Sequence, residues 1–286
     1  YTPYKNRWKR EWIDKKLLGH KFDTESHFSH FVKTDPIAFP DLEQIGFKST
    51  QTAFSTPDIP HEIIRHYHNT RDFPAMQGTS KLGAHLRFGS QSIRRAMQEG
   101  FHLNEIWFDE LIWREFYMMI LYHYPRVETQ PFRSKYEFIE WNNDPEEFET
   151  WCRGETGFPI VDAGMRELNE TGFMHNRVRM IAASFLSKTL LIDWRWGERY
   201  FAEKLLDFDL ASNNGNWQWA AGTGCDAAPY FRIFNPITQM RKYDKKLEYV
   251  KRWVGEYGTP HYPQPMVDLR ICRERTIRAY KKAAQN

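Results

Sequence analysis

The sequence predicts an all-α fold. From Ser55 onward, apolar side chains recur every three or four residues over long stretches, which is the spacing of helices packed on one face. No stretch alternates Val, Ile and Thr with polar residues in the way that predicts a half-buried strand. With 41% hydrophobic and 16% aromatic residues the chain can fill a core, which excludes a disordered protein. Its 286 residues suit one large domain or two small ones.

Three long helices are predicted in the first two thirds of the chain. Residues 103–124 carry apolar side chains at helical spacing, and Pro125 stops the pattern. Residues 159–170 begin at a proline and end before Gly172, as helices often do. Residues 176–194 are apolar on most sides, so we expect this helix to be central.

The rest of the chain is divided as follows. We expect a helix over 197–206, a loop rich in Asn and Gly over 213–216, and helices over 242–257 and 268–284. Residues 1–50 are basic at first and then interrupted by Pro and Gly, so they are either a connector from an absent upstream domain or a flexible tail. We take the connector interpretation and assign residues 51–286 to the helical domain.

Charge and cysteine content exclude several classes of protein. The net charge of +3 does not by itself indicate a nucleic-acid binder. Three scattered cysteines (Cys152, Cys225 and Cys272) fit neither a disulfide scaffold nor a metal cluster, and no metal is expected. No signal peptide or apolar stretch of membrane-spanning length is seen, so we expect a cytoplasmic protein without a membrane partner.

Some polar residues stand where apolar ones are expected. Glu110 and Arg114 are four residues apart on one helix face and form either a surface ion pair or part of a site. Asn176, Arg177 and Arg179 open the most apolar helix, where free N–H groups bind anions, or else they form a solvated first turn.

Two further polar runs have the same ambiguity. Thr79 and Ser80 precede an expected helix and serve either as N-caps or as donors to phosphate oxygens. Asp207, Asp209 and Asn213 only faintly match a calcium loop, because the glutamate that completes such a loop is missing.

Six blocks of residues carry a family resemblance. They occur in the order in which the DNA photolyase/cryptochrome family has them, and together they resemble its helical flavin domain, most closely that of class I cyclobutane pyrimidine dimer photolyases. The blocks are 78–82 (GTSKL), 107–116 (WFDELIWREF), 156–163 (TGFPIVDA), 174–180 (MHNRVRM), 213–219 (NNGNWQW) and 228–236 (APYFRIFNP). The family's N-terminal α/β antenna domain has no counterpart here, which agrees with a connector at residues 1–50.

The resemblance implies an FAD held inside the helical domain, active in its reduced form. Asn213 would face flavin N5, as in photolyases, whereas plant cryptochromes have Asp there. Phe173 departs from the Trp that is common in the family. The residues implied to hold FAD are Tyr67, Thr79, Ser80, Lys81, Leu82, Gly83, Trp107, Arg114, Asn176, Arg179, Asp207, Asp209 and Asn213.

The resemblance also implies the substrate and the reaction. Light would drive an electron from reduced FAD into a pyrimidine dimer in double-stranded DNA, and the dimer would split. Trp113 and Trp219 would stack on the flipped dimer, and Glu110 would meet its carbonyl edge. The implied substrate residues are Glu110, Trp113, Asn176, Arg177, Met180 and Trp219, and the histidines of six-four photolyases are absent at Asn176 and Met180.

Three tryptophans match the family's electron-transfer chain, from Trp217 through Trp194 to Trp141 at the surface. Arg177, Arg232 and Arg241 would contact DNA phosphates, and the protein would act as a monomer. A folate or deazaflavin antenna pigment would need the missing domain. The alternatives are a cryptochrome-like photoreceptor without repair activity, and a fragment that binds flavin or damaged DNA without turnover.

Overall fold

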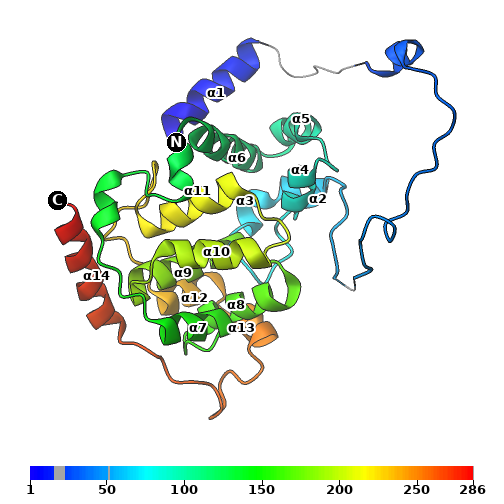
Figure 1. The fold of residues 1–286 in the computed structure, drawn as a ribbon. Coiled ribbons are helices and arrows are strands. Elements are labelled where there is room, and N and C mark those ends of the chain that lie inside the picture. The colour runs from blue at the N-terminus through cyan, green and yellow to red at the C-terminus, as the bar shows by residue number, and fades with distance from the viewer. Residues whose placement is uncertain (16–22, 51, 286) are drawn as a thin grey trace.

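The structure is a computed structural model that describes residues 1–15, 23–50 and 52–285. Within these residues the chain forms helices and no β-strand, which confirms the all-α prediction (Figure 1). The predicted domain boundary falls beside residue 51, which lies outside the described residues, as do residues 16–22 and 286.

Most connections between the helices after residue 60 are short, and the longest are residues 222–235 and 254–268. The bounds of the helices are α1 Thr2–Asp14, η1 Glu25–His30, α2 His61–Arg65, α3 Tyr67–Thr70, α4 Gly83–Phe88, α5 Ile93–Leu103, α6 Glu105–His123, η2 Pro125–Glu128, η3 Ser134–Phe138, α7 Pro145–Arg153, α8 Pro159–Thr171, α9 Asn176–Ser184, η4 Phe185–Leu190, α10 Trp194–Lys204, α11 Leu210–Ala221, α12 Pro236–Tyr243, α13 Glu248–Trp253 and α14 Leu269–Ala283.

Three predicted helices are confirmed, and local signals explain their ends. Asn104 caps α6 by accepting from the N–H groups of Ile106 at 3.0 Å and Trp107 at 3.2 Å. Helix α8 ends at Gly172, whose φ of 68° is the left-handed conformation that glycine adopts without strain. Asp268 caps α14 through the N–H of Arg270 at 2.7 Å.

The prediction of one helix over residues 176–194 is wrong at its C-terminal end. Helix α9 passes into the π-helical turn η4, and the chain then reverses at Leu191, which has a φ of 58°. Trp194 instead begins α10, which Asp193 caps by accepting from the N–H of Arg195 at 3.0 Å. The break was hidden because the residues on both sides of it are apolar and buried.

The predicted loop over residues 213–216 is also wrong, because these residues lie inside α11. Asp209 caps this helix through the N–H of Ser212 at 2.9 Å. Gly215 is needed for close packing, since a Cβ there would lie 2.1 Å from the ring of Tyr117 on α6. Tertiary packing and side-chain hydrogen bonds therefore override the low helix propensity of Asn and Gly.

The predicted helix over residues 242–257 is two helices, α12 and α13. Asp244 separates them: its carboxylate accepts from the N–H groups of Tyr249 at 3.1 Å and Val250 at 2.9 Å. Leu247, with a φ of 59°, turns the chain between the two helices.

Helix α1 packs beside α6 (Figure 1). Trp12 is buried against Phe108, and Lys5 donates to Asp109 at 2.8 Å. Residues 23–50, by contrast, are exposed and run out from the helical body (Figure 1). The first part of the predicted connector thus contributes to the packed body, and the assignment of residues 1–50 to a connector stays a prediction.

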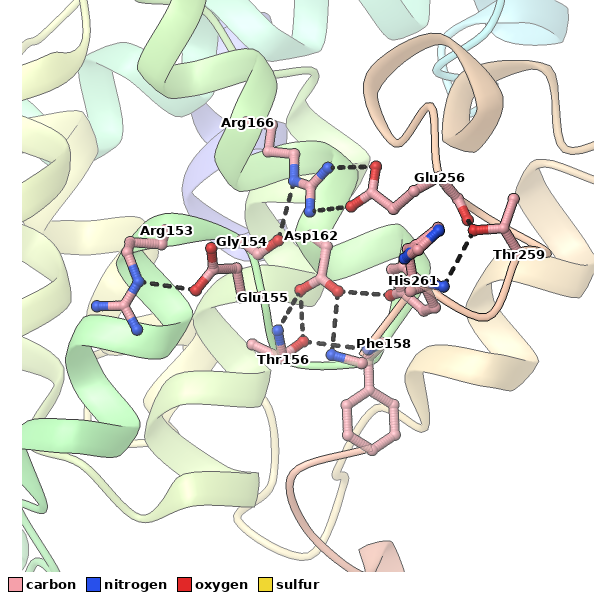
Figure 2. Close-up of polar contacts among 12 residues, drawn as sticks. Arg153, Gly154, Glu155, Thr156, Phe158, Asp162, Arg166, Glu256, Thr259 and His261 are labelled. Atoms are coloured by element: carbon pink, nitrogen blue, oxygen red, sulfur yellow. Dashed lines mark hydrogen bonds and ion pairs between the residues drawn. The ribbon is translucent and has the colours of Figure 1, made fainter. Parts of the chain in front are cut away.

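The buried carboxylate of Asp162 joins α8 to two loops (Figure 2). Its Oδ1 accepts from the N–H of Thr156 at 2.8 Å and the hydroxyl of Thr156 at 2.6 Å, and its Oδ2 accepts from Gly157 N at 3.1 Å and the Tyr262 hydroxyl at 2.5 Å. Nearby, Arg166 makes a bidentate ion pair with Glu256 (Figure 2). Burial raises the pKa of Asp162, and the hydrogen bonds oppose that rise.

We expect Asp162→Asn to lower the free energy of unfolding by about 2 kcal/mol, because the amide turns N–H groups toward donors that then lose their acceptor. Glu256→Gln is the matched control, since its partly exposed ion pair is worth at most about 1 kcal/mol. Urea unfolding followed by far-ultraviolet circular dichroism measures both. Equal losses in the two variants would contradict this account of Asp162.

Candidate functional site

Three adjoining hollows lie where α6, α9 and α11 approach the segment 74–83, and all three are lined by Asp207. The first, of about 90 Å³, lies between α9, α10 and α11 and reaches Asn213 and Trp217. A second, of about 330 Å³, opens between α6, α9 and α11. The third, of about 410 Å³, lies between the segment 74–81, the start of α9 and α13.

An ion pair between Arg179 and Asp207 stands at the junction of the hollows. The Arg179 guanidinium donates to both carboxylate oxygens of Asp207, at 2.9 and 3.0 Å, and its Nε donates to the carbonyl of Met174 at 2.7 Å. Each side chain is about a quarter exposed, at 24% and 22%. The pair fixes both groups toward the cavity.

Asn213 presents a free acceptor to the first hollow. Its Nδ2 donates to the backbone carbonyl of Glu198 at 3.0 Å and to the Glu198 carboxylate at 2.8 Å. Because both partners are acceptors, the amide can only have its nitrogen toward Glu198. Within the part of the chain that the structure describes, Oδ1 is left without a hydrogen-bond donor. Burial raises the pKa of Glu198, and the bond from Asn213 opposes this.

The segment 79–83 turns its residues in different directions. Thr79 and Lys81 line the third hollow and Gly83 the second. Ser80 accepts from the indole N–H of Trp107 at 3.3 Å, and Leu82 is buried.

The idea that the hydroxyls of Thr79 and Ser80 cap the next helix is wrong. Leu82 occupies the N-cap position of α4, and no side chain bonds there. Asp209, in contrast, caps α11 while it lines the first and second hollows.

The second hollow brings together most of the implied substrate residues. Trp113 on α6 and Trp219 on α11 both line it, with Glu110, Met180 and Asn176. The ring of Trp113 is itself stacked on Tyr1, with centroids 3.4 Å apart, and on Tyr117 at 5.5 Å. Two indoles from different helices therefore share a cavity with one carboxyl group.

The expected ion pair between Glu110 and Arg114 is wrong. Glu110 pairs with Arg71, and Arg114 donates to the carbonyl of Leu86 at 3.3 Å while it lines the second hollow. Burial raises the pKa of Glu110, and the Arg71 guanidinium opposes that rise.

Sequence reasoning missed Arg71 and Asp72. Arg71 lines the second hollow and lies over the ring of Tyr67, with 5.2 Å from Cζ to the ring centroid. Its position four residues after Tyr67, on the same helical face, could have indicated it. Asp72 accepts from Arg177 at 2.5 Å, and the Arg177 guanidinium also lies 4.4 Å from the Tyr243 ring centroid. Arg177 is thus beside the second hollow, outside its lining residues.

The third hollow has a cationic and aromatic wall. Lys81 Nζ lies 4.9 Å from the ring centroid of Phe173, and Arg179 approaches the same ring at 5.7 Å. His175 is buried in this wall and caps α9 through Nδ1, which accepts from the N–H of Arg177 at 3.1 Å. Burial, with help from Arg179 and Arg177, lowers the pKa of His175 to about 4, so the imidazole is neutral and can accept.

The three tryptophans implied to transfer electrons lie in connected parts of the fold. Trp217 and Trp194 are buried, and Trp141 is partly exposed. Helix α10 approaches Trp217 so closely that a Cβ on Gly197 would lie 2.2 Å from its ring.

The segment after Trp141 is bonded to the start of α10. Asn142 N donates to the carbonyl of Leu191 at 2.7 Å, and Asp193 N donates to the side chain of Asn143 at 2.8 Å. The electron-transfer role of the three tryptophans stays a prediction.

The described residues contain neither a cluster of metal ligands nor a membrane-spanning helix. No three His, Cys, Asp or Glu side chains are gathered to hold a metal ion. Nor is any helix in these residues both long and apolar enough to cross a membrane.

Comparison with known proteins places this geometry in a family. The sequence model described as the FAD binding domain of DNA photolyase matches residues 107–260. The chain is 46% identical over 258 residues to the deoxyribodipyrimidine photo-lyase of Vibrio cholerae, covering 79% of this chain and 54% of that protein.

Solved structures agree with this placement. A class III photolyase from Agrobacterium tumefaciens superposes with a TM-score of 0.74 at 40% identity, over 78% of this chain and 53% of the other. A cryptochrome from Synechocystis superposes with a TM-score of 0.69 at 32% identity, over 76% of this chain and 52% of the other.

The chain therefore belongs to the DNA photolyase family and contains its FAD-binding domain. It spans about half the length of the curated relatives that it matches first. The residues of the hollows fit this cofactor. Arg179, Asp207 and the free Oδ1 of Asn213 suit a polar ring edge, and Trp217 supplies an apolar face beside them. Thr79 and Lys81 add a hydroxyl and a cation for phosphate oxygens.

We expect Asp207→Asn to weaken FAD binding by about tenfold, or about 1.4 kcal/mol, because it leaves the Arg179 guanidinium without its counter-charge. Glu137→Gln is the control, since its ion pair with Arg195 lies away from the hollows. Fluorescence titration of the apoprotein with FAD gives both dissociation constants. Similar dissociation constants for Asp207→Asn and wild type would contradict the role of the pair.

Proposed function

We propose that this chain is the catalytic part of a photolyase that repairs cyclobutane pyrimidine dimers in double-stranded DNA. One observation carries the proposal: the hollow lined by Trp113, Trp219 and Glu110 shares a wall with the hollow of Asn213 and the Arg179–Asp207 pair. A pyrimidine dimer and a redox cofactor would then lie next to each other. The curated relatives named deoxyribodipyrimidine photo-lyase support the same activity.

When bound, FAD would supply the redox chemistry, which is light-driven donation of an electron to the dimer with no net change of oxidation state. The chain's own residues bind, orient and exclude water. Arg179 and Asp207 hold the polar edge of the cofactor, and Asn213 accepts a hydrogen bond at Oδ1 because Glu198 holds the other end of its amide. Thr79, Lys81 and Gly83 receive the phosphates and the ribityl chain.

The second hollow receives the dimer after it leaves the DNA stack. Trp113 and Trp219 offer apolar faces for stacking, and damaged bases unstack at lower cost than intact ones. Glu110 meets the polar edge of the pyrimidines. Burial favours the protonated form of Glu110, whereas the Arg71 guanidinium favours the carboxylate. In its protonated form Glu110 would donate a hydrogen bond to a carbonyl where negative charge develops.

DNA would be held by arginines around the hollow. Arg232 is exposed on the segment after α11, Arg241 is exposed at the end of α12, and Arg177 lies beside Asp72. Contacts of this kind with phosphates make affinity fall with salt. We propose a monomer that acts in the cytoplasm on chromosomal DNA, and an antenna pigment held outside the described helical body.

The cryptochrome alternative predicts light-driven flavin chemistry without repair. The lesion-type set of Glu110, Met180 and Trp219 in one hollow favours repair. The non-catalytic fragment remains the third outcome, and it predicts binding without turnover.

We expect the reduced, FAD-loaded protein to remove dimers from a dimer-containing oligonucleotide only under light, and Glu110→Ala to slow this removal by about tenfold or more. Glu105→Ala is the matched control, because Glu105 lies on the same helix with its side chain 79% exposed. Chromatography of the illuminated oligonucleotide measures repair. The proposal would be falsified if the wild-type protein left the dimers intact.

We expect Trp217→Phe to slow the photoreduction of oxidised FAD by about tenfold or more, which corresponds to about 1.4 kcal/mol in the barrier. The reason is that Trp217 is the buried indole beside the cofactor hollow, and Phe is much harder to oxidise. Trp8→Phe on α1 serves as the control. Loss of the oxidised flavin absorbance under blue light with a thiol reductant reports the rate. A Trp217→Phe variant that bleaches as fast as wild type would rule out this route.

A further inference from the structure

A buried lysine that has no role in the chemistry described above lies under the segment after α11. Lys188 belongs to the π-helical turn η4 and its exposed fraction is 0%. Its Nζ donates to the backbone carbonyls of Arg232 at 3.3 Å and Pro229 at 3.5 Å. Nζ also lies beside the C-terminal end of α11, since a Cβ on Gly222 would be 3.5 Å away.

No carboxylate makes an ion pair with Lys188 among the described residues. Its surroundings are carbonyl dipoles and the negative end of the α11 dipole, which favour a cation or a hydrogen-bond donor. Burial, with help from the charge of Arg232, lowers the pKa of Lys188 to about 7. A neutral amine keeps two N–H groups, so in either protonation state Nζ can donate to both carbonyls.

The segment over Lys188 has little support of its own. Residues 223–235 form no helix, and they connect Trp219 on α11 to α12. Neighbouring elements hold it: besides the two bonds from Lys188, Phe234 N donates to Ser184 Oγ at 3.4 Å and Ala228 N donates to the carbonyl of Trp219 at 3.3 Å. From α14, Arg273 donates to the carbonyl of Phe231 at 3.3 Å, and Tyr280 stacks on Tyr230. Ser184 and Lys188 are one turn apart, so the same helical turn supports both ends of residues 229–234.

Arg232 is held on one side and exposed on the other. Its carbonyl faces the buried Lys188, while the residue as a whole is exposed and its guanidinium lies 5.7 Å from the ring centroid of Phe234. The backbone position of Arg232 therefore sets where its cation meets solvent. The Lys188 carbonyl in turn accepts from the Thr276 hydroxyl, which anchors η4 to α14.

We propose that Lys188 is a positioning residue for DNA binding: by holding the carbonyls of Pro229 and Arg232, it fixes the segment that presents the Arg232 guanidinium to a DNA phosphate. This inference rests on the proposed function. Lys188 then affects the contact with a DNA phosphate. It has no effect on the second hollow, because Lys188 does not line that hollow.

The test compares Lys188→Met, Arg232→Ala and the double variant of the FAD-loaded protein. Met keeps the length of the side chain and removes the donor. Because Met leaves the carbonyls of Pro229 and Arg232 without this donor, we expect the unfolding temperature to fall while the far-ultraviolet circular dichroism spectrum stays that of the wild type. Affinity for duplex DNA is measured with and without a dimer, at several salt concentrations.

We expect Lys188→Met to weaken binding of both duplexes about fivefold and to lower the salt slope by up to about 0.9, the value for one phosphate contact. In the Arg232→Ala background the same substitution should have almost no further effect, because both changes remove one contact. Thr276→Val is the matched control, since it loosens η4 from α14 and leaves Nζ in place; it should keep the wild-type salt slope.

Each other outcome overturns a stated claim. Wild-type affinity and slope in Lys188→Met, or additive losses in the double variant, would overturn the positioning role. A loss confined to the dimer-containing duplex would also overturn it, because a phosphate contact does not distinguish the two. If the wild-type protein bound neither duplex, the proposed function itself would fail, and that result is separate from any effect of Lys188.

Discussion

The Arg179–Asp207 ion pair joins the parts of the molecule on which the site depends. Arg179 comes from the first turns of α9, and Asp207 from the turn before α11. Gly83 at the start of α4 lies against Asp207, and a Cβ there would be 3.0 Å from Oδ2. A cation, a carboxylate and a residue without a side chain therefore bring three distant segments together at the point shared by the three hollows.

The apolar run formed by α9 and η4 supports two separate parts of the proposed DNA site. Its N-terminal end carries Asn176 and Met180 into the hollows, and its C-terminal end, wound as η4, puts Lys188 beneath residues 229–232. The polar residues at the two ends break the apolar pattern for different reasons. Those at the start face a cavity, and Lys188 satisfies backbone carbonyls that would otherwise be buried without a donor.

Local signals predicted the helices whose ends are set by nearby residues. Gly172 ends α8 where the sequence indicated, and the caps Asn104 and Asp268 lie at the predicted starts of α6 and α14 to within one residue. The predictions that failed concern elements set by distant contacts. The Asn-rich run at 213–216 is helical because α6 packs on Gly215, and the break at Leu191 is hidden in an apolar run that is buried on both sides of it.

The sequence by itself determined the fold class, the family resemblance and most of the residues that line the first and second hollows. Helical periodicity and the residue types of the blocks are local properties of the chain. Only the tertiary structure decided which groups the polar side chains of the site pair with. It paired Glu110 with Arg71 in place of Arg114, oriented Asn213 through Glu198, and buried Lys188 under a loop more than forty residues further on. Pairings of this kind depend on how the chain returns to itself, and side-chain spacing along the sequence does not contain that information.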